Sequence, residues 1–240
     1  MEPASTTVGG RSQWPPAGVV FDCDGVLVDS EPIHARATTE WAAGLGITLS
    51  SNFLHDLVGM TVAQQVALIV RETSHDPYKS YQAREKHFWS VADEIGPMLG
   101  AGTVARRLKA DGTRIAIASS GSHRYLQHVI DLLELGDVID GYIGAEDVTH
   151  PKPHPEPYTK AVAMLGLRPQ SCVAIEDSAT GTASASAAGL KVIKLDAATP
   201  TSSGYAEGMA TAADFNGVAA LLYGNCRRLK ENSRTDGLDD

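Results

Sequence analysis

The sequence is poor in the features that mark secreted, membrane-spanning and nucleic-acid-binding proteins. Its three cysteines, Cys23, Cys172 and Cys226, have neither paired nor metal-ligand spacing, which indicates a reducing compartment and favours a cytoplasmic protein. No apolar run is long enough to span a bilayer, and residues 1–16 lack the apolar segment of a signal peptide. The net charge of −9 argues against a nucleic-acid partner, because phosphate neutralisation needs clustered lysine and arginine. A small anionic ligand, held by a metal ion and a few donors, is not excluded.

The chain of 240 residues is long enough for one large domain or for a core with a smaller insertion. The apolar run Val19 to Phe21 predicts a buried strand. Residues 32–96 carry helical patterns and no convincing strand, whereas residues 100–195 alternate between helices and short β-branched strands. Such alternation predicts a parallel sheet with helices on both faces. The predicted strands after the first are residues 114–118, 142–144, 172–175 and 190–195.

We therefore predict an α/β protein in which a helical segment is inserted just after the first strand of a parallel sheet. Ser30 is the expected N-cap of the first inserted helix. Oligomeric state leaves no signature in this sequence, and a monomer is our expectation. The predicted parts are a core of residues 17–31 and 97–224, a helical insertion of residues 32–96, and polar tails at residues 1–16 and 225–240.

Two carboxylates, Asp22 and Asp24, follow the first predicted strand directly. In open α/β sheets the ligand lies at the carboxyl ends of the strands. Two acids this close repel each other unless a hard divalent cation such as Mg²⁺ lies between them. The alternative is an ordinary acidic turn, because Asp-Gly is a common turn pair.

The later strand ends also carry polar groups. Ser119-Ser120-Gly121 offers a hydroxyl and backbone N–H groups before a helix, which suits an anion. Lys152 lies in a proline-dense loop, and Glu176-Asp177-Ser178 ends the strand at 172–175. Taken singly, Ser119 could equally be a helix N-cap and Lys152 a surface lysine. The nearby His150 and His154 lack the usual partner spacing of metal ligands and predict only a loop.

Together these groups favour phosphoryl transfer. A phosphate monoester dianion repels a carboxylate nucleophile such as Asp22, so attack needs a cation. The Asp22 side chain, a backbone carbonyl near Asp24 and Asp177 could hold Mg²⁺. Lys152 and Ser119 could bind the phosphoryl oxygens, where charge spreads in the transition state. Asp24 could protonate the leaving oxygen and later deprotonate water.

The same residues resemble the motifs of a known family, the haloacid dehalogenase superfamily, and the resemblance covers nearly everything from Val19 to Leu195. It implies a Rossmann-like core, a helical cap inserted between the first and second motifs, and dependence on Mg²⁺. The four ordered motifs are Asp22-x-Asp24-Gly25-x-x-x-Asp29, Ser119 after an apolar strand, Lys152-Pro153, and Glu176-Asp177-Ser178-x-x-Gly181. The resemblance implies that Asp22 is the nucleophile, Asp24 the general acid and base, Ser119 a phosphate-binding residue and Lys152 a charge-stabilising residue. It also implies that Asp22, Asp24 and Asp177 bind the metal. Glu176 either binds the metal too or lies directly behind a residue that does.

The segment Ser30-Glu31-Pro32-x-His34 is similar to the small sugar-phosphate phosphatases and β-phosphoglucomutases of this superfamily. The resemblance implies that His34 lies at the cap hinge near substrate, and the alternative is a histidine on the helix surface. Further candidates for substrate binding are Gly25, Ser120 and Gly121.

The mutases of this branch carry a phosphate-gripping arginine in the cap, and this chain has Val62 at the corresponding place after Gly59-Met60-Thr61. We therefore expect a Mg²⁺-dependent phosphatase that acts on a small phosphorylated metabolite, through an aspartyl-phosphate intermediate. A phosphoglucomutase-like isomerase is the alternative, followed by a non-catalytic binding protein on the same fold. A dehalogenase would not need Asp24, Glu176 or Asp177.

Overall fold

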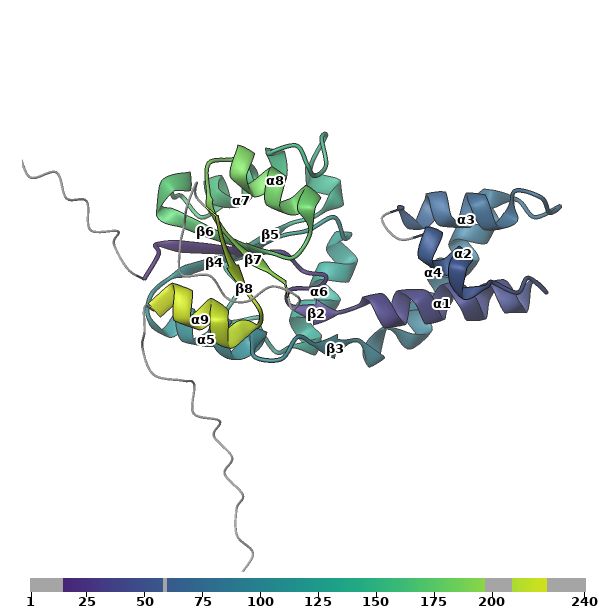
Figure 1. The fold of residues 1–240 in the computed structure, drawn as a ribbon, viewed down its shortest axis with the longest axis horizontal. Helices are drawn as coiled ribbons and strands as arrows, with labels where there is room; N and C mark the ends of the chain where they lie inside the picture. The colour runs from purple at the N-terminus through teal and green to yellow at the C-terminus, as the bar shows by residue number, and fades with distance from the viewer. Residues whose placement is uncertain (1–14, 58–59, 197–208, 224–240) are drawn as a thin grey trace, which may run out of the picture. The chain divides into compact units, whose positions relative to one another are not determined.

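The computed structural model of the protein describes residues 15–57, 60–196 and 209–223. The predicted tails, apart from residues 15 and 16, lie outside the described residues, as do Gly59 and Cys226. No helix in the described part of the chain is long and apolar enough to cross a membrane. Two compact units make up the chain, as Figure 1 shows. They are a core unit, Met1–Val26 with Leu99–Asp240, and a helical unit, Leu27–Met98.

The core unit contains a six-stranded sheet in the order β5-β4-β1-β6-β7-β8, and every neighbouring pair of strands in it is parallel. Each strand predicted from the sequence is present, so the predicted parallel sheet is confirmed. β1 comes first in the sequence and lies inside the sheet. The later strands lie on both sides of it, with β4 and β5 on one side and β6, β7 and β8 on the other. The strands are β1 (Gly18–Phe21), β4 (Arg114–Ala118), β5 (Gly141–Ile143), β6 (Cys172–Glu176), β7 (Lys191–Leu195) and β8 (Met209–Ala212).

Helices cover both faces of this sheet, with α7 and α8 on one face and α5 and α9 on the other (Figure 1). One row of side chains across the sheet, Val20, Ala116, Ala174 and Val192, packs in a buried cluster with residues of α7 and α8. Small and β-branched residues in this row let the helices approach the sheet closely. The core-unit helices are α5 (Ala101–Ala110), α6 (His123–Leu132), α7 (Glu156–Met164), α8 (Ala179–Ala187) and α9 (Phe215–Tyr223).

Two strand features were not predicted. β8 has the sequence Met-Ala-Thr-Ala, which offers one β-branched residue and no strong strand pattern, and it pairs with β7 at the edge of the sheet formed by the described strands. In the helical unit, β2 (Val28–Asp29) pairs with β3 (Gly96–Pro97) in an antiparallel ladder too short for any periodicity. This ladder holds the two ends of the helical unit side by side.

The helical unit consists of helices around a small apolar core, as predicted for the inserted segment. Trp41, Leu57, Val66 and Ile69 form the centre of that core, and partly buried apolar residues pack around them. A capping box between Thr61 and Gln64 starts α3, and the Asp76 side chain accepts a hydrogen bond from Lys79 N to cap α4. The helices are α1 (Glu31–Gly44), α2 (Ser51–Asp56), α3 (Val62–Val70) and α4 (Pro77–Val91), followed by the 3₁₀ turn Ala92–Glu94.

Ser30 occupies the N-cap position of α1, as predicted, but its side chain makes no capping hydrogen bond. Its backbone is in the helical region (φ −89°, ψ −19°). Its carbonyl accepts hydrogen bonds from the N–H groups of Ile33 and His34 instead. At the other end, Gly46 adopts a left-handed φ of 77°, shortly after the last residue of α1, Gly44.

Candidate active site

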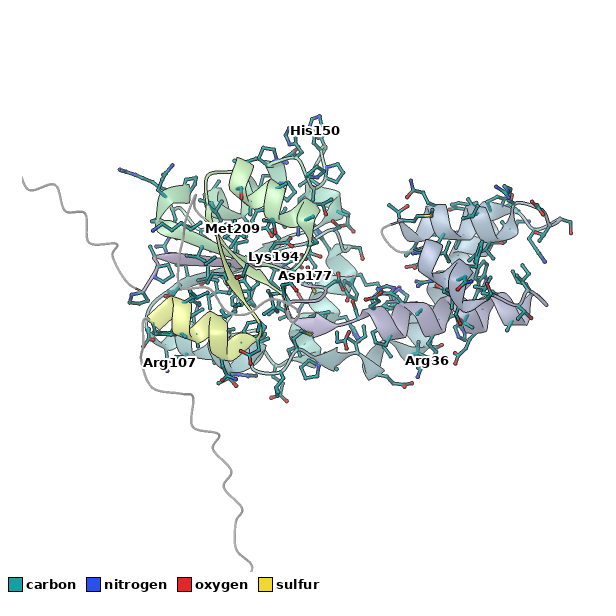
Figure 2. The ribbon with its side chains drawn as sticks, in the orientation of Figure 1. Arg36, Arg107, His150, Asp177, Lys194 and Met209 are labelled. Carbon is teal, nitrogen blue, oxygen red and sulfur yellow. The ribbon has the colours of Figure 1, made fainter. Side chains whose placement is uncertain are left out.

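Three neighbouring strands end at the same edge of the core sheet and carry the predicted site residues there. β4, β1 and β6 are adjacent and parallel, so Ser119, Asp22 and Glu176 lie at the same edge. The Asp22 N–H continues the ladder by donating to the carbonyl of Ile175 at 2.9 Å. Figure 2 marks Asp177, the residue after β6, among the side chains of the core unit.

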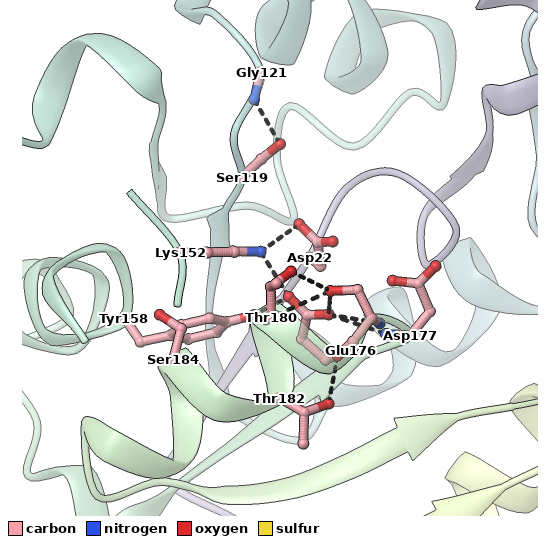
Figure 3. A network of polar contacts seen from close by, with 12 residues as sticks. Asp22, Ser119, Gly121, Lys152, Tyr158, Glu176, Asp177, Thr180, Thr182 and Ser184 are labelled. Atoms are coloured by element: carbon pink, nitrogen blue, oxygen red, sulfur yellow. Dashed lines mark hydrogen bonds and ion pairs between the residues drawn. The ribbon is translucent and has the colours of Figure 1, made fainter. Parts of the chain in front are cut away.

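Lys152 joins two of these carboxylates, as Figure 3 shows. Its Nζ donates to Asp22 Oδ1 at 2.8 Å and to Glu176 Oε1 at 2.6 Å. The three side chains are 7%, 11% and 0% exposed, respectively. Burial acts to lower the pKa of Lys152, but the carboxylates of Asp22 and Glu176 outweigh it and the net pKa is raised. The ammonium therefore stays charged and ties the loop before α7 to the strand ends.

Both carboxylate oxygens of Glu176 are held by donors. Oε1 accepts from Lys152 Nζ and from the Tyr158 hydroxyl at 2.9 Å. Oε2 accepts from the N–H groups of Asp177 and Ser178, both at 3.1 Å, and from the Ser178 hydroxyl at 2.9 Å. A fully buried carboxylate needs such partners, because its desolvation would otherwise be prohibitive. The Glu176 carboxylate is thus held in one orientation by protein donors.

Negative charge is concentrated at this edge. Burial raises the pKa of Asp22 to about 7, although Lys152 acts to lower it. Burial also raises the pKa of Asp177 to about 6, and the neighbouring Glu176 carboxylate adds to the rise.

The same carboxylates could hold a metal ion. Asp22, Glu176 and Asp177 can each offer one oxygen such that the three oxygens lie within 4.8 Å of one another. Gly25, with φ 73°, leaves space here, since a Cβ on it would lie 2.0 Å from Asp177 Oδ2. An all-oxygen set with excess negative charge fits a hard divalent cation such as Mg²⁺.

The turn after β4 is held by its own serine. Ser119 is buried, and its Oγ accepts a hydrogen bond from Gly121 N at 3.0 Å. Ser122, rather than Ser119, is the N-cap of α6, so the N-cap alternative for Ser119 is wrong. An accepting Oγ retains its own O–H as a donor.

A second group of possible metal ligands, His150, His154 and Glu156, surrounds Lys152 in the sequence. Glu156 accepts hydrogen bonds from the N–H groups of Thr149 and His150, and its own N–H donates to His154 Nδ1 at 3.2 Å. These contacts tie the three residues into a hydrogen-bonded loop, and the expectation that this loop holds no metal stays a prediction.

The sequence model of the haloacid dehalogenase-like hydrolases matches residues 16–189, which is well over half of the chain. The chain belongs to this hydrolase family. Hexitol phosphatase B of Escherichia coli K12 is 32% identical over 183 residues, which cover 74% of this chain and 82% of that protein. The structure of CbbY from Rhodobacter sphaeroides in complex with phosphate is similar, with a TM-score of 0.65 and 25% identity over 75% of this chain and 86% of CbbY.

A haloacid dehalogenase-superfamily hydrolase of subfamily IA from Geobacter sulfurreducens PCA has a TM-score of 0.72 over 88% of this chain and 98% of its own. Its 21% identity shows a shared fold alone. The predicted family, the predicted fold class and the prediction of a hydrolase are confirmed by these comparisons together with the parallel sheet.

In this hydrolase the fold brings together most of the predicted site residues. Asp22, Lys152 and Glu176 are in direct contact, and Asp177 and Gly25 adjoin them. Asp24 is also at the end of β1, where its Oδ1 accepts a hydrogen bond from the Tyr125 hydroxyl at 2.5 Å. Their roles in catalysis stay predictions.

His34 belongs to the helical unit and is described with it. Its Nδ1 lies 3.1 Å from Arg84 Nη2, and its ring stacks on Phe88 with a centroid distance of 4.4 Å and an interplanar angle of 8°. Arg84 is fully buried, and its guanidinium also donates to Thr38 Oγ1 and to the Glu85 carboxylate. The predicted contact of His34 with substrate stays a prediction.

Sequence reasoning missed two tyrosines that contact the acidic residues. Tyr158, on the first turn of α7, donates to Glu176, and Tyr125, on the first turn of α6, donates to Asp24. Neither belongs to a motif that we singled out. Their only signal in the sequence is position, because each lies in the first turn of a helix that follows a predicted loop of the site.

Proposed function

We propose that this hydrolase is a Mg²⁺-dependent phosphatase that cleaves a small phosphorylated metabolite, a sugar phosphate or a related ester, through an aspartyl-phosphate on Asp22. The observation that carries the proposal is the buried Lys152 bridge between Asp22 and Glu176 at the strand ends. Such a bridge holds a carboxylate nucleophile and a cation for the phosphoryl oxygens in one fixed arrangement. The similarity to hexitol phosphatase B supports a phosphorylated sugar or polyol as the substrate class.

The proposed reaction has two displacements at phosphorus. An oxygen of Asp22 attacks the phosphorus while the ester P–O bond breaks, and Asp24 gives its proton to the departing alcohol oxygen. Water then attacks the phosphorus of the aspartyl-phosphate, Asp24 takes the proton, and inorganic phosphate leaves with Asp22 regenerated. Two of the three N–H donors of Lys152 are used by Asp22 and Glu176, which leaves one for a phosphoryl oxygen. The Ser119 hydroxyl would supply another donor.

Asp22, Asp177 and a backbone carbonyl near Asp24 would hold Mg²⁺ in this proposal. The resemblance allows Glu176 either to bind the metal or to lie directly behind a metal ligand. We propose the second, because both Glu176 oxygens accept hydrogen bonds from protein donors. The bound ion would supply positive charge that offsets the repulsion between the phosphate dianion and the Asp22 carboxylate.

The helical unit would serve as the cap. Closure of such a unit over a bound ester would exclude bulk water and select the leaving group. Gly25, Ser120, Gly121 and His34 stay candidates for substrate contact. A monomer stays our expectation for the oligomeric state.

The first test is phosphate release, with and without Mg²⁺, from hexitol phosphates, hexose phosphates, phosphoglycolate, glycerol phosphates and nucleotides. We expect release from one sugar or polyol ester well above the others, lost with EDTA and restored by Mg²⁺. Activity that survives chelation would contradict the metal assignment. Glucose 1-phosphate is followed separately, because its conversion to glucose 6-phosphate without phosphate release would favour the mutase.

The second test replaces the nucleophile. Asp22→Asn keeps the size of the side chain but removes the nucleophilic oxygen, so turnover should be abolished while the protein still folds, which its circular dichroism spectrum checks. Asp137→Asn, at an exposed aspartate of the same unit, is the matched control and should leave activity unchanged. Turnover by Asp22→Asn equal to that of the control would remove Asp22 from its role.

A further inference from the structure

Tyr125 contacts the proposed acid and base of the site through a short hydrogen bond. Its hydroxyl donates to Asp24 Oδ1 at 2.5 Å, across 101 residues of sequence. This distance is at the short end of the range for O–H···O hydrogen bonds, about 2.5–3.0 Å. The Tyr125 side chain is only 6% exposed, so the hydroxyl is held among protein atoms rather than in bulk solvent.

The turn after β4 sets the place of this tyrosine. The Ser122 side chain caps α6 by accepting from Tyr125 N, at 3.3 Å, which fixes the first turn of the helix. Gly121 leaves room for the ring, since a Cβ on it would lie 2.6 Å from Tyr125 Cδ1. The same glycine donates its N–H to Ser119 Oγ. One turn therefore positions both a proposed phosphate-binding hydroxyl and the partner of Asp24.

The two carboxylates after β1 are thus held by donors of different kinds. Asp22 Oδ1 accepts from the Lys152 ammonium, and Asp24 Oδ1 accepts from the neutral Tyr125 phenol. A charged donor suits a carboxylate that must stay ionised as a nucleophile. A neutral donor fixes the orientation of a carboxylate without adding charge that would oppose proton exchange. Proton transfer requires such fixed geometry, because the acid must lie within hydrogen-bond reach of the leaving oxygen.

We infer that Tyr125 is a positioning residue for proton transfer by Asp24 and sets the rate at which poor leaving groups are expelled. The inference rests on the proposed phosphatase function. Removal of the Tyr125 hydroxyl should slow esters whose alcohol needs a proton to leave, and should spare esters whose leaving group departs as a stable anion. A role in packing alone would affect both kinds of ester alike.

The test compares two substrates in the Mg²⁺-loaded full chain: sorbitol 6-phosphate, which has an alkyl leaving group, and p-nitrophenyl phosphate, whose nitrophenolate leaves without a proton. For Tyr125→Phe we expect kcat on sorbitol 6-phosphate to fall about tenfold to a hundredfold, the scale of one hydrogen bond to a charged group. KM should stay within about threefold, because the lost interaction acts on the chemical step. On p-nitrophenyl phosphate kcat should fall by less than about threefold.

A double-variant cycle connects the effect to Asp24. Asp24→Asn should show the same substrate pattern with a larger loss, about 10²–10⁴-fold on the alkyl ester. Adding Tyr125→Phe to Asp24→Asn should then lower kcat no further, since coupled residues act as one unit. Tyr142→Phe, at a tyrosine of the adjacent strand β5, is the matched control and should leave both rates unchanged.

The outcomes separate this inference from the proposed function. If Asp24→Asn is selective for the alkyl ester and Tyr125→Phe is not, or if the two losses multiply in the double variant, the role of Tyr125 is wrong and the proposed function stands. If Asp24→Asn slows both esters equally, Asp24 is not the proton donor, and the inference falls together with that part of the proposed function. The ring of Tyr125 is retained in Tyr125→Phe, and an unchanged unfolding midpoint confirms that the variant is folded.

Discussion

Gly181 gives the sharpest prediction for the buried hydrogen bonds around Glu176. Gly181 lies within α8 and is buried against the Glu176 carboxylate. A Cβ at this position would lie 1.6 Å from Oε1, 2.0 Å from Cδ and 2.3 Å from Oε2 of Glu176. Gly181→Ala must therefore displace the carboxylate that Lys152, Tyr158 and Ser178 hold.

Two opposing effects decide the magnitude. Helix propensity alone favours alanine over glycine by about 1 kcal/mol in a helix interior. Breaking a buried, hydrogen-bonded ion pair costs about 3–5 kcal/mol, and overpacking adds to this cost. We expect Gly181→Ala to lower the free energy of unfolding by about 2–4 kcal/mol in total, which combines these terms. For a chain of this size each kcal/mol corresponds to about 2–4 °C, so the unfolding midpoint should fall by roughly 6–12 °C for a loss near 3 kcal/mol.

The assay is thermal and urea unfolding of Gly181→Ala, with phosphatase activity measured on the same samples at a temperature where the variant is folded. Gly44→Ala is the matched control, because Gly44 is also helical and a Cβ there meets nothing within 4 Å. The control should be neutral or more stable by up to about 1 kcal/mol. A Gly181→Ala protein with the stability and activity of the control would refute the tight packing of α8 against Glu176.

Two further predictions concern charges elsewhere in the molecule. Arg84→Met removes the buried guanidinium that joins α4 to α1. Amide hydrogen exchange in these two helices should then accelerate by a factor that corresponds to about 1–3 kcal/mol. Lys79→Met, at an exposed position of α4, is the control and should leave exchange unchanged. Burial acts to raise the pKa of Asp140, but hydrogen bonds from Lys109 and from the backbone of β4 outweigh it and the net pKa is lowered. Its folded pKa thus lies below the unfolded value of about 3.9, so the stability it contributes is present at neutral pH and is lost as pH falls through the folded pKa. Urea unfolding of Asp140→Asn should show a deficit at pH 7 that shrinks in strong acid, and a pH-independent deficit would contradict this account.

Much of the architecture could be predicted because the strands are apolar and end in polar residues. A buried parallel strand such as Val19 to Phe21 has no amphipathic pattern, so its length and its abrupt end at Asp22 identify it. Parallel pairing then brings Asp22, Ser119 and Glu176 to one edge of the sheet. β8 was missed because Met-Ala-Thr-Ala carries little strand propensity, and its place beside β7 comes from tertiary packing.

The hydrogen-bond partners could not be predicted, since they depend on side chains that are far apart in the sequence. Asp24 and Tyr125 are 101 residues apart, and Lys152 and Asp22 are 130 apart. Ser30 does occupy the N-cap position, but its backbone is already in the helical region, so its side chain makes no capping hydrogen bond. A cap needs extended backbone for its side chain to reach the N–H groups of the first turn.

The charges at the strand ends connect the fold to the proposed chemistry. Asp22, Glu176 and Asp177 place three carboxylates together, and the ammonium of Lys152 offsets one of them. Glu176 accepts hydrogen bonds from Lys152, Tyr158 and Ser178 with both of its oxygens, whereas Lys152 reaches Asp22 through Oδ1. The two carboxylates of Asp22 and Asp177 match the charge of one divalent ion, and they are the pair whose pKa values burial raises. In the proposed function, Asp22 and Asp177 would therefore supply the carboxylate oxygens for the ion, and Asp22 would also attack the phosphoryl group.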